Sequence, residues 1–276
     1  MLPTVIVIGA AKCGTTSVHE YLDDHPEVAM SAEKELNFFV EEKNWPRGIA
    51  WYESQFDPDA PVRGESSPTY TAYPEYHGVP ERIRSVVPDA KLIYLVRDPI
   101  ERILSHYLHR TTVRPQPLEE ALARDDLRER LVAVSRYWLQ LTRYLPHFPE
   151  EQILVVDSDE LRHDRAVTMR RIFGFVGVDP DFTSAGFERS HNRAIGQTRK
   201  RRSGQAVVSV LERTLGPART QRLRERAPAA VKAPFVHQVE RPQLDDGWRE
   251  RLADELRDDV ERLRAHTGLA LAGWSL

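Results

Sequence analysis

The sequence of 276 residues contains a single cysteine, Cys13. One cysteine excludes an internal disulfide and a zinc site built from several cysteines, and it suits a reducing compartment. No apolar stretch is long enough to cross a bilayer, and the N-terminus lacks the charged segment, apolar segment and cleavage site of a secretory signal. We therefore expect a cytoplasmic protein without a membrane partner.

The chain also lacks a strong excess of charge of either sign, because 39 basic and 42 acidic residues leave a formal net charge of -3. Such a balance gives no overall attraction to nucleic acid or to an anionic membrane, so any anion site must be local. Lysine is scarce, since only 6 of the 39 basic residues are lysines. A lysine inside a loop of glycines and hydroxyls is therefore conspicuous.

Three short runs of consecutive apolar residues predict β-strands, at residues 4–8, 91–98 and 152–157. Helical patterns follow the first two runs, over residues 15–22 and through "IERILSHYLHR" after Pro99, and a third helical pattern over residues 137–148 precedes the last run. Continuous apolar strands are typical of a parallel sheet that is covered on both faces. We predict an α/β fold, a P-loop-like α/β/α sandwich with a central parallel sheet.

The composition changes after Phe182, where "SHNRAIGQTRKRRSG" is polar and basic, and helix-like segments then continue to "WRERLADELRDDVERLRAHTG". No repeat or linker divides the chain. We predict one domain over residues 1–276, with an α/β core to about residue 203 and a helical C-terminal extension over residues 204–276.

The segment "VIVIGAAKCGTTS" places Gly9 and Gly14 at the spacing of a Walker A loop, but its lysine is Lys12 rather than the residue after the second glycine. A strand that feeds through such a turn into a helix presents backbone N–H groups and the positive end of the helix dipole to an anion. Further donors come from the hydroxyls of Thr15, Thr16 and Ser17. The loop predicts a phosphate site; the alternative is a tight turn with a solvated lysine and a hydroxyl N-cap.

The second strand-to-helix junction carries another candidate pair. Arg97 follows the apolar run of the second strand, at the edge where open α/β sheets bind ligands, and Ser105 lies about two helical turns later. Both side chains could face one phosphate. Taken singly, Arg97 could instead pair with Asp98 or Glu101, and the serine could bond to its own helix.

Together these two segments resemble the sulfotransferases that use 3′-phosphoadenosine 5′-phosphosulfate (PAPS) as sulfuryl donor. In that family a K-x-G-T-T/S loop binds the 5′-phosphosulfate, and an R-D-P-x-x-R-x-x-S-x-Y segment binds the 3′-phosphate through its arginine and serine. The resemblance implies PAPS as co-substrate, 3′-phosphoadenosine 5′-phosphate (PAP) as product, and no metal. It assigns the first role to Lys12, Cys13, Gly14, Thr15, Thr16 and Ser17, and the second to Arg97 and Ser105, with Arg102 and Tyr107 also matching.

Further segments resemble the branch that contains heparan sulfate sulfotransferases and bacterial relatives. "HPEVAMSAEKELNFF" is similar to a segment whose glutamate is the proposed base, which implies Glu35. "GESSPTY" is similar to another, but Ser66 stands where heparan enzymes carry a lysine implicated in catalysis and substrate contact, which argues against a heparan acceptor. The run Arg199, Lys200, Arg201 and Arg202 is similar to a loop that closes over the nucleotide; by itself it could also be a solvated face or a nucleic-acid patch.

Sulfuryl transfer requires in-line positioning of donor and acceptor and stabilisation of charge on the leaving phosphate. Lys12 and the loop amides suit the second task, and Glu35 could take the acceptor proton. Without the resemblance, Lys34 and Glu35 would be an ordinary exposed ion pair. A set of aromatic residues could line an acceptor pocket or belong to the core: Phe38, Phe39, Trp51, Tyr52 and Tyr70.

We therefore predict a PAPS-dependent sulfotransferase that acts on a hydroxyl or amine of a small-molecule or glycan acceptor, without a nucleic-acid partner. The sequence leaves the acceptor and the oligomeric state open. Two alternatives remain. A P-loop kinase or NTPase would normally carry the lysine after Gly14 together with an acidic group for Mg²⁺, and a non-catalytic nucleotide-binding protein could have kept the fold.

Overall fold

The computed structural model describes residues 1–111, 117–188, 198–200, 236–238 and 242–276. The chain divides into two compact units by its internal contacts. The larger comprises Met1–Tyr107, Gln116–Asn192 and Leu244–Leu276, and the smaller comprises Leu108–Pro115 and Arg193–Gln243. The described part of the smaller unit includes an antiparallel pair of strands, β6 (Thr198–Lys200) and β7 (Val236–Gln238). The single-domain organisation stays a prediction, because contact units are not folding domains.

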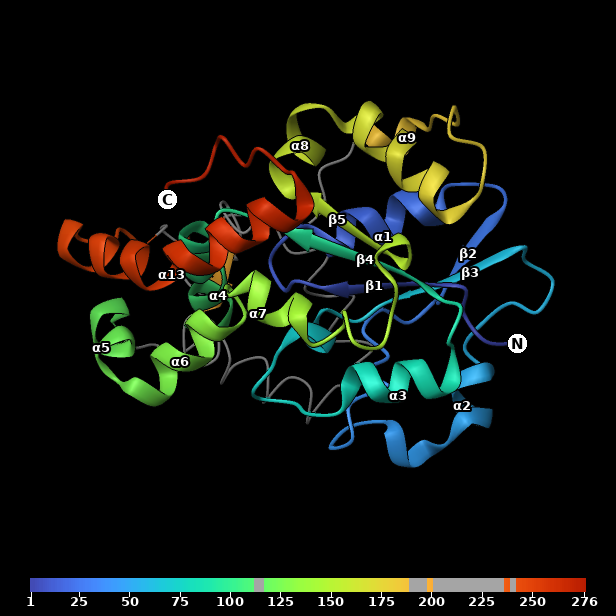
Figure 1. Cartoon of the computed structure of the whole chain (residues 1–276), viewed down its shortest axis with the longest axis horizontal. Coiled ribbons are helices and arrows are strands. Elements are labelled where there is room, and N and C mark those ends of the chain that lie inside the picture. Colours follow the sequence, from blue (N-terminus) through green and yellow to red (C-terminus); the bar gives the residue numbers. More distant parts are fainter. Residues whose placement is uncertain (112–116, 189–197, 201–235, 239–241) are drawn as a thin grey trace. The chain divides into compact units, whose positions relative to one another are not determined.

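A five-stranded sheet lies at the centre of the larger unit, and its strands follow the order β2-β3-β1-β4-β5 (Figure 1). All four strand pairings are parallel, as predicted. The strands are β1 (Val5–Gly9), β2 (Val28–Met30), β3 (Val62–Ser66), β4 (Lys91–Val96) and β5 (Ile153–Asp157).

Helices cover both faces of the sheet, and Figure 1 shows α9 and α3 on opposite sides of it. This arrangement confirms the α/β/α sandwich. The described α-helices are α1 (Thr15–Asp23), α2 (Ile49–Glu53), α3 (Val79–Val86), α4 (Pro99–Thr111), α5 (Leu118–Ala123), α6 (Asp125–Ala133), α7 (Tyr137–Thr142), α8 (Ser158–His163), α9 (Arg165–Val176) and α13 (Asp246–Thr267). Short 3-10 turns are η1 (Trp45–Arg47), η2 (Pro68–Thr71), η3 (Glu150–Gln152) and η4 (Ala185–Glu188).

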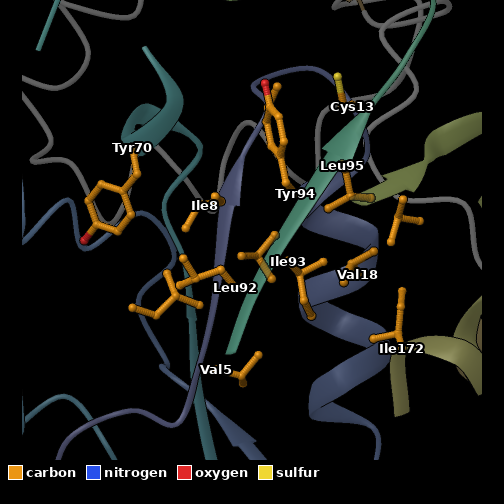
Figure 2. Close-up of a cluster of buried hydrophobic side chains, with 14 of the residues drawn as sticks. Val5, Ile8, Cys13, Val18, Tyr70, Leu92, Ile93, Tyr94, Leu95 and Ile172 are labelled. Carbon is orange, nitrogen blue, oxygen red and sulfur yellow. The ribbon is translucent and has the colours of Figure 1, made fainter. Parts of the chain in front are cut away.

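The core lies against the central strands on both faces. Every residue of β1 and all but the first of β4 are buried, which explains why these strands are apolar without alternation. Figure 2 shows Val18 of α1 and Ile172 of α9 on one side of these strands and Tyr70 on the other. The two helix-covered faces share one hydrophobic cluster.

Some elements differ from the sequence-based expectations. The sequence of β3 is VRGES, and its charged residues and glycine give no pattern that predicts a strand. The strand forms because it pairs with both β1 and β2. α7 ends at Thr142 rather than at residue 148, and the chain continues in hydrogen-bonded turns. The C-terminal helix is confirmed as α13, with one buried apolar stripe. The helices expected between residues 204 and 235 lie outside the described residues.

The strand order positions the ligand-binding edge. From β1 the chain passes through α1 toward β2 and β3, whereas from β4 it passes in the opposite direction toward β5. The carboxyl ends of β1 and β4 are therefore adjacent at the point where the strand order reverses. Open α/β sheets bind ligands in the crevice formed there. The predicted phosphate loop follows β1 and Arg97 follows β4.

Candidate functional site

The loop between β1 and α1 is shaped by positive backbone φ angles, 75° at Lys12 and 91° at Gly14. Successive backbone N–H groups in such turns form a concave anion site. No side chain caps the N-terminus of α1, because its N-cap is Gly14, so the loop hydroxyls do not serve as the N-cap. Gly9 packs directly against η2, since a Cβ atom there would lie 1.9 Å from Thr71 Oγ1. The loop thus needs glycine at its entry.

Lys12 lies in a concentration of positive charge. Its pKa is lowered, first by burial and then by Lys34, Arg102 and Arg97, whereas the carboxylate of Glu35 raises it. The structure therefore brings charges from the first loop, from the end of β4 and from helix α4 within electrostatic reach of one ammonium. Cations held this close repel one another, and a ligand with several negative charges relieves that repulsion.

Glu35 is held beside this cluster by its backbone. Its φ is 65°, its N–H donates to Ser66 O at 2.9 Å, and its carbonyl accepts from Asn37 Nδ2 at 2.7 Å. The carboxylate pairs with Lys34 Nζ at 3.2 Å, with the two side chains 52% and 21% exposed respectively. The ion-pair reading of Lys34 and Glu35 is therefore confirmed, and the same carboxylate remains accessible at the edge of the sheet near Lys12.

Ser66 is buried against helix α1. Its side chain is fully buried, and its Oγ lies 3.1 Å from Nδ1 of His19 on α1. The imidazole also bonds to the backbone of Ser31, and burial lowers the pKa of His19, with Lys34 acting in the same direction. The serine at the position of the heparan-enzyme lysine is thus part of a buried hydroxyl–imidazole contact. Sequence reasoning did not find His19, because its partner lies 47 residues away.

The segment after β3 surrounds a buried carboxylate that sequence reasoning also missed. Glu65 is fully buried and accepts hydrogen bonds from Tyr52 OH at 2.5 Å, Ser67 Oγ at 2.7 Å and Tyr70 OH at 2.9 Å. Burial raises the pKa of Glu65, although the three hydroxyl donors oppose that shift. The only signal in the sequence was the pairing of this glutamate with hydroxyl residues two and five positions later.

Most of the candidate aromatic residues belong to the core rather than to a pocket. Phe38 stacks on Tyr52 with ring centroids 4.2 Å apart, and Phe39 meets Tyr70 edge-on. These four side chains are buried. Trp51 is partly buried, with the guanidinium of Arg47 over its ring at 3.9 Å. The core interpretation of this cluster is therefore the correct one.

At the end of β4, Arg97 and Ser105 approach the same side of helix α4. The Arg97 guanidinium lies 3.4 Å from Glu101 Oε2. Glu101 and Ser105 are four residues apart on the helix and so share one face. Asp98 caps the helix, because its Oδ1 accepts from the N–H of Glu101 at 2.9 Å. The pairing of Arg97 with Glu101, which the sequence offered as an alternative to a phosphate contact, is present, and Glu101 shares its helix face with Ser105.

Arg102 is the fully buried cation of this site. Its Nε donates to Ser135 Oγ at 2.5 Å, its Nη1 lies 3.1 Å from His106 Nδ1, and its Nη2 donates to Leu131 O. Among the described residues no carboxylate forms an ion pair with it. Burial lowers the pKa of Arg102, as a charge removed from water without an opposite partner requires.

Cys13 turns its side chain into the core (Figure 2). The thiol lies 3.6 Å from Tyr137 OH, and burial raises its pKa to about 11. A contact of Cys13 with a nucleotide could therefore come only from its backbone. Of the loop hydroxyl residues, Thr15 is buried and Thr16 and Ser17 are half-buried.

The basic run belongs to the smaller unit and is described only in part. Arg199 and Lys200 belong to β6, and Arg201 and Arg202 fall outside the described residues. Their contact with a nucleotide stays a prediction. Within the described ranges, no group of three or more His, Cys, Asp and Glu side chains could hold a metal ion. In those same ranges, no helix is both long and apolar enough to cross a membrane.

Comparison with known proteins agrees with this geometry. Residues 2–203 match the model of the family described as "Sulfotransferase domain". Heparan sulfate glucosamine 3-O-sulfotransferase 3B1 of Homo sapiens is 33% identical over 197 residues, which cover 67% of this chain and 49% of that protein. Bifunctional heparan sulfate N-deacetylase/N-sulfotransferase 2 of Homo sapiens is 28% identical over 237 residues, covering 73% of this chain and 26% of that protein.

A solved structure is also similar over most of its length. The sulfotransferase from Alicyclobacillus acidocaldarius superimposes with a TM-score of 0.61 and 27% identity, covering 83% of this chain and 98% of that one. Against the two curated relatives the coverage is smaller, because the chain spans 49% of one and 26% of the other. The similarity therefore concerns one part of those longer proteins.

Proposed function

The chain belongs to the sulfotransferase domain family, a family of PAPS-dependent enzymes, and we propose that it transfers a sulfuryl group from PAPS to a hydroxyl or amine of a small-molecule or glycan acceptor. The observation that carries the proposal is the loop from β1 into α1, where Lys12 lies beside a helix N-terminus that no side chain caps and Arg97 follows the neighbouring strand β4. PAPS presents a phosphosulfate and a separate 3′-phosphate, so it can engage a loop cation and a strand-end cation together.

The two phosphate positions follow from the two strand ends. The 5′-phosphosulfate would lie on the loop, with donors from Lys12 and from residues 13–17, whose hydroxyl members are Thr15, Thr16 and Ser17. The 3′-phosphate would lie on Arg97 and Ser105, which share one side of helix α4. Arg199, Lys200, Arg201 and Arg202 are the candidates for closing over the nucleotide.

The chemistry is an in-line displacement. The acceptor oxygen or nitrogen forms a bond to sulfur while the bond from sulfur to the bridging phosphate oxygen breaks, and PAP leaves with that electron pair. Lys12 stabilises the charge that grows on the bridging oxygen. Glu35 takes the proton that the acceptor loses, and its half-exposed carboxylate near Lys12 supports this role.

The proposed acceptor rests on the chemistry of the site rather than on the names of the relatives. The names of the relatives include heparan sulfate. In this chain, however, Ser66 is buried against His19 and offers no cation to a sulfated glycan. We therefore favour an acceptor other than heparan sulfate, a small molecule or another glycan. Turnover without metal and a cytoplasmic location stay predictions.

The experiment that tests this function supplies PAPS with a panel of alcohols, phenols, amines and sugars and follows the mass of each acceptor. A gain of one sulfuryl group on at least one acceptor class, unchanged by EDTA, is the expected result. A gain of phosphoryl from ATP and Mg²⁺ instead, under otherwise equal conditions, would support a phosphotransferase and contradict the proposal.

A further inference from the structure

The last six residues, 271–276, here called the C-terminal tail, lie against the carboxyl ends of β4 and β5. Figure 1 shows this red end of the chain turning back from α13 beside α8. Leu271 and Trp274 are buried, the latter 6% exposed. Helix α13 also contacts the tail, because Arg264 donates to Leu271 O at 3.2 Å and to Leu276 O at 3.4 Å. It is therefore part of the wall at the ligand-binding edge.

One contact joins the tail to the segment of the 3′-phosphate arginine. The backbone N–H of Ser275 donates to Asp98 Oδ2 at 2.5 Å, and the other oxygen of the same carboxylate caps helix α4 through the N–H of Glu101. Asp98 is buried, so both oxygens need their partners. Asp98 follows Arg97 directly, and Arg97 contacts Glu101 in the same first turn.

A second set of contacts joins the tail to the phosphate loop. The Trp274 indole N–H lies 3.5 Å from Oδ1 of Asp157, which caps helix α8 after β5. The indole ring packs on Tyr137 with centroids 5.6 Å apart, and Tyr137 OH lies 3.6 Å from Cys13 Sγ. The tail thus contacts both strand-end aspartates and, through one tyrosine, the loop that carries Lys12.

We propose that the C-terminal tail is a positioning element for Arg97, and that it sets the preference of the site for nucleotides with a 3′-phosphate. This inference rests on the proposed function. The N–H of Ser275 occupies the second oxygen of Asp98. Without that donor, this carboxylate oxygen is free to accept from the neighbouring Arg97 guanidinium. The carboxylate then competes with the 3′-phosphate for the N–H groups of Arg97.

The test compares two substitutions at one residue. Ser275→Pro removes the backbone donor, whereas Ser275→Ala keeps it and alters only an exposed side chain. Binding of PAP and of adenosine 5′-phosphate, which lacks the 3′-phosphate, is measured by calorimetry for each variant. We expect Ser275→Pro to weaken PAP binding by about tenfold and to leave adenosine 5′-phosphate binding unchanged. Ser275→Ala should match the wild type for both ligands.

A second variant separates positioning from damage to the fold. Asp98→Asn can still cap α4 through its amide oxygen, but its NH₂ group cannot accept the N–H of Ser275. Because an NH₂ group cannot accept from the Arg97 guanidinium either, Asp98→Asn alone should keep the preference for PAP, and adding it to Ser275→Pro should restore the PAP affinity that Ser275→Pro loses.

Unchanged selectivity for PAP in Ser275→Pro, or a loss in Ser275→Pro that Asp98→Asn does not restore, would make the tail a purely structural element and overturn the inference alone. A wild-type chain that binds PAP no better than adenosine 5′-phosphate would overturn the inference and the proposed donor together.

Discussion

Lys12 and Arg97 are both cations of the proposed donor site, but they meet the donor at different stages. Arg97→Ala removes a charge-assisted contact that is present in bound donor and product alike, so PAP affinity should fall by roughly 1.5–3 kcal/mol. Lys12→Ala removes a donor that acts mainly on the charge developed during transfer, so turnover should fall on the order of 10²–10³-fold. Calorimetry with PAP and single-turnover rates with PAPS measure the two effects. Parallel losses of affinity and rate in both variants would refute this division.

Glu35 is the proposed base, and its substitution gives the sharpest prediction at this scale. Glu35→Gln keeps the size of the side chain but cannot take a proton, so turnover should fall by ~10²–10⁴-fold while PAP affinity barely changes. Its exposed ion pair with Lys34 contributes less than about 1 kcal/mol to stability, so the melting temperature should hardly move. Glu33→Gln, a change at an exposed carboxylate two residues away, is the matched control. A Glu35→Gln enzyme that turns over an alkyl alcohol at the wild-type rate rules Glu35 out.

The residues that the sequence identified are those whose role is local. Lys12, Gly14 and Thr15 lie in one loop, so their spacing alone indicates an anion site. By contrast, His19 meets Ser66 and Trp274 meets Asp157 through contacts between segments far apart in the chain. No local pattern marks such residues, because their partners are chosen by the packing of the sheet.

At the scale of elements, β3 depends on the carboxylate it buries. Glu65→Ala would leave the hydroxyls of Tyr52, Ser67 and Tyr70 without their acceptor and should lower the free energy of unfolding by roughly 3 kcal/mol or more. Glu65→Gln keeps an acceptor oxygen and should cost less. Urea unfolding followed by fluorescence measures both. A smaller loss for the alanine variant than for the glutamine variant would contradict the network.

The pH dependence of the same element has a defined sign. Burial raises the folded-state pKa of Glu65 above its usual value of 4.5, so the folded state holds this proton more tightly than the unfolded chain. The stability that protonation gives is present below pH 4.5 and is lost as the pH rises through the folded pKa. Relative to the wild type, Glu65→Gln should therefore become more stable as the pH is raised from 4.5.

The strands found from the sequence are those with long apolar runs. β1, β4 and β5 are continuous apolar runs, and their positions were predicted to within two residues at each end. β2 is an apolar run of only three residues, and β3 contains Arg63, Gly64 and Glu65, so neither shows an apolar run long enough to predict a strand. β3 becomes a strand because its backbone pairs with β1 and β2, and β2, at the sheet edge, because its backbone pairs with β3.

At the scale of the larger unit, an almost neutral chain concentrates its cations at one place. The net charge of -3 gives no general attraction for anions, yet Lys12, Arg97 and Arg102 influence one another at the carboxyl edge of the sheet. The strand order explains this concentration, because it makes the ends of β1 and β4 neighbours. The fold therefore supplies a local concentration of positive charge that composition alone could not predict.

Calorimetric titration of the wild-type chain with PAP, and separately with ATP and Mg²⁺ under identical conditions, tests the central claim most directly. In the proposed site the loop with Lys12 binds the 5′ end, and Arg97 with Ser105 binds a 3′-phosphate. We expect PAP to bind at least about tenfold more tightly than ATP, since only PAP supplies the second charge-assisted contact. That preference should not depend on Mg²⁺. Tighter binding of ATP with Mg²⁺ than of PAP would contradict the account.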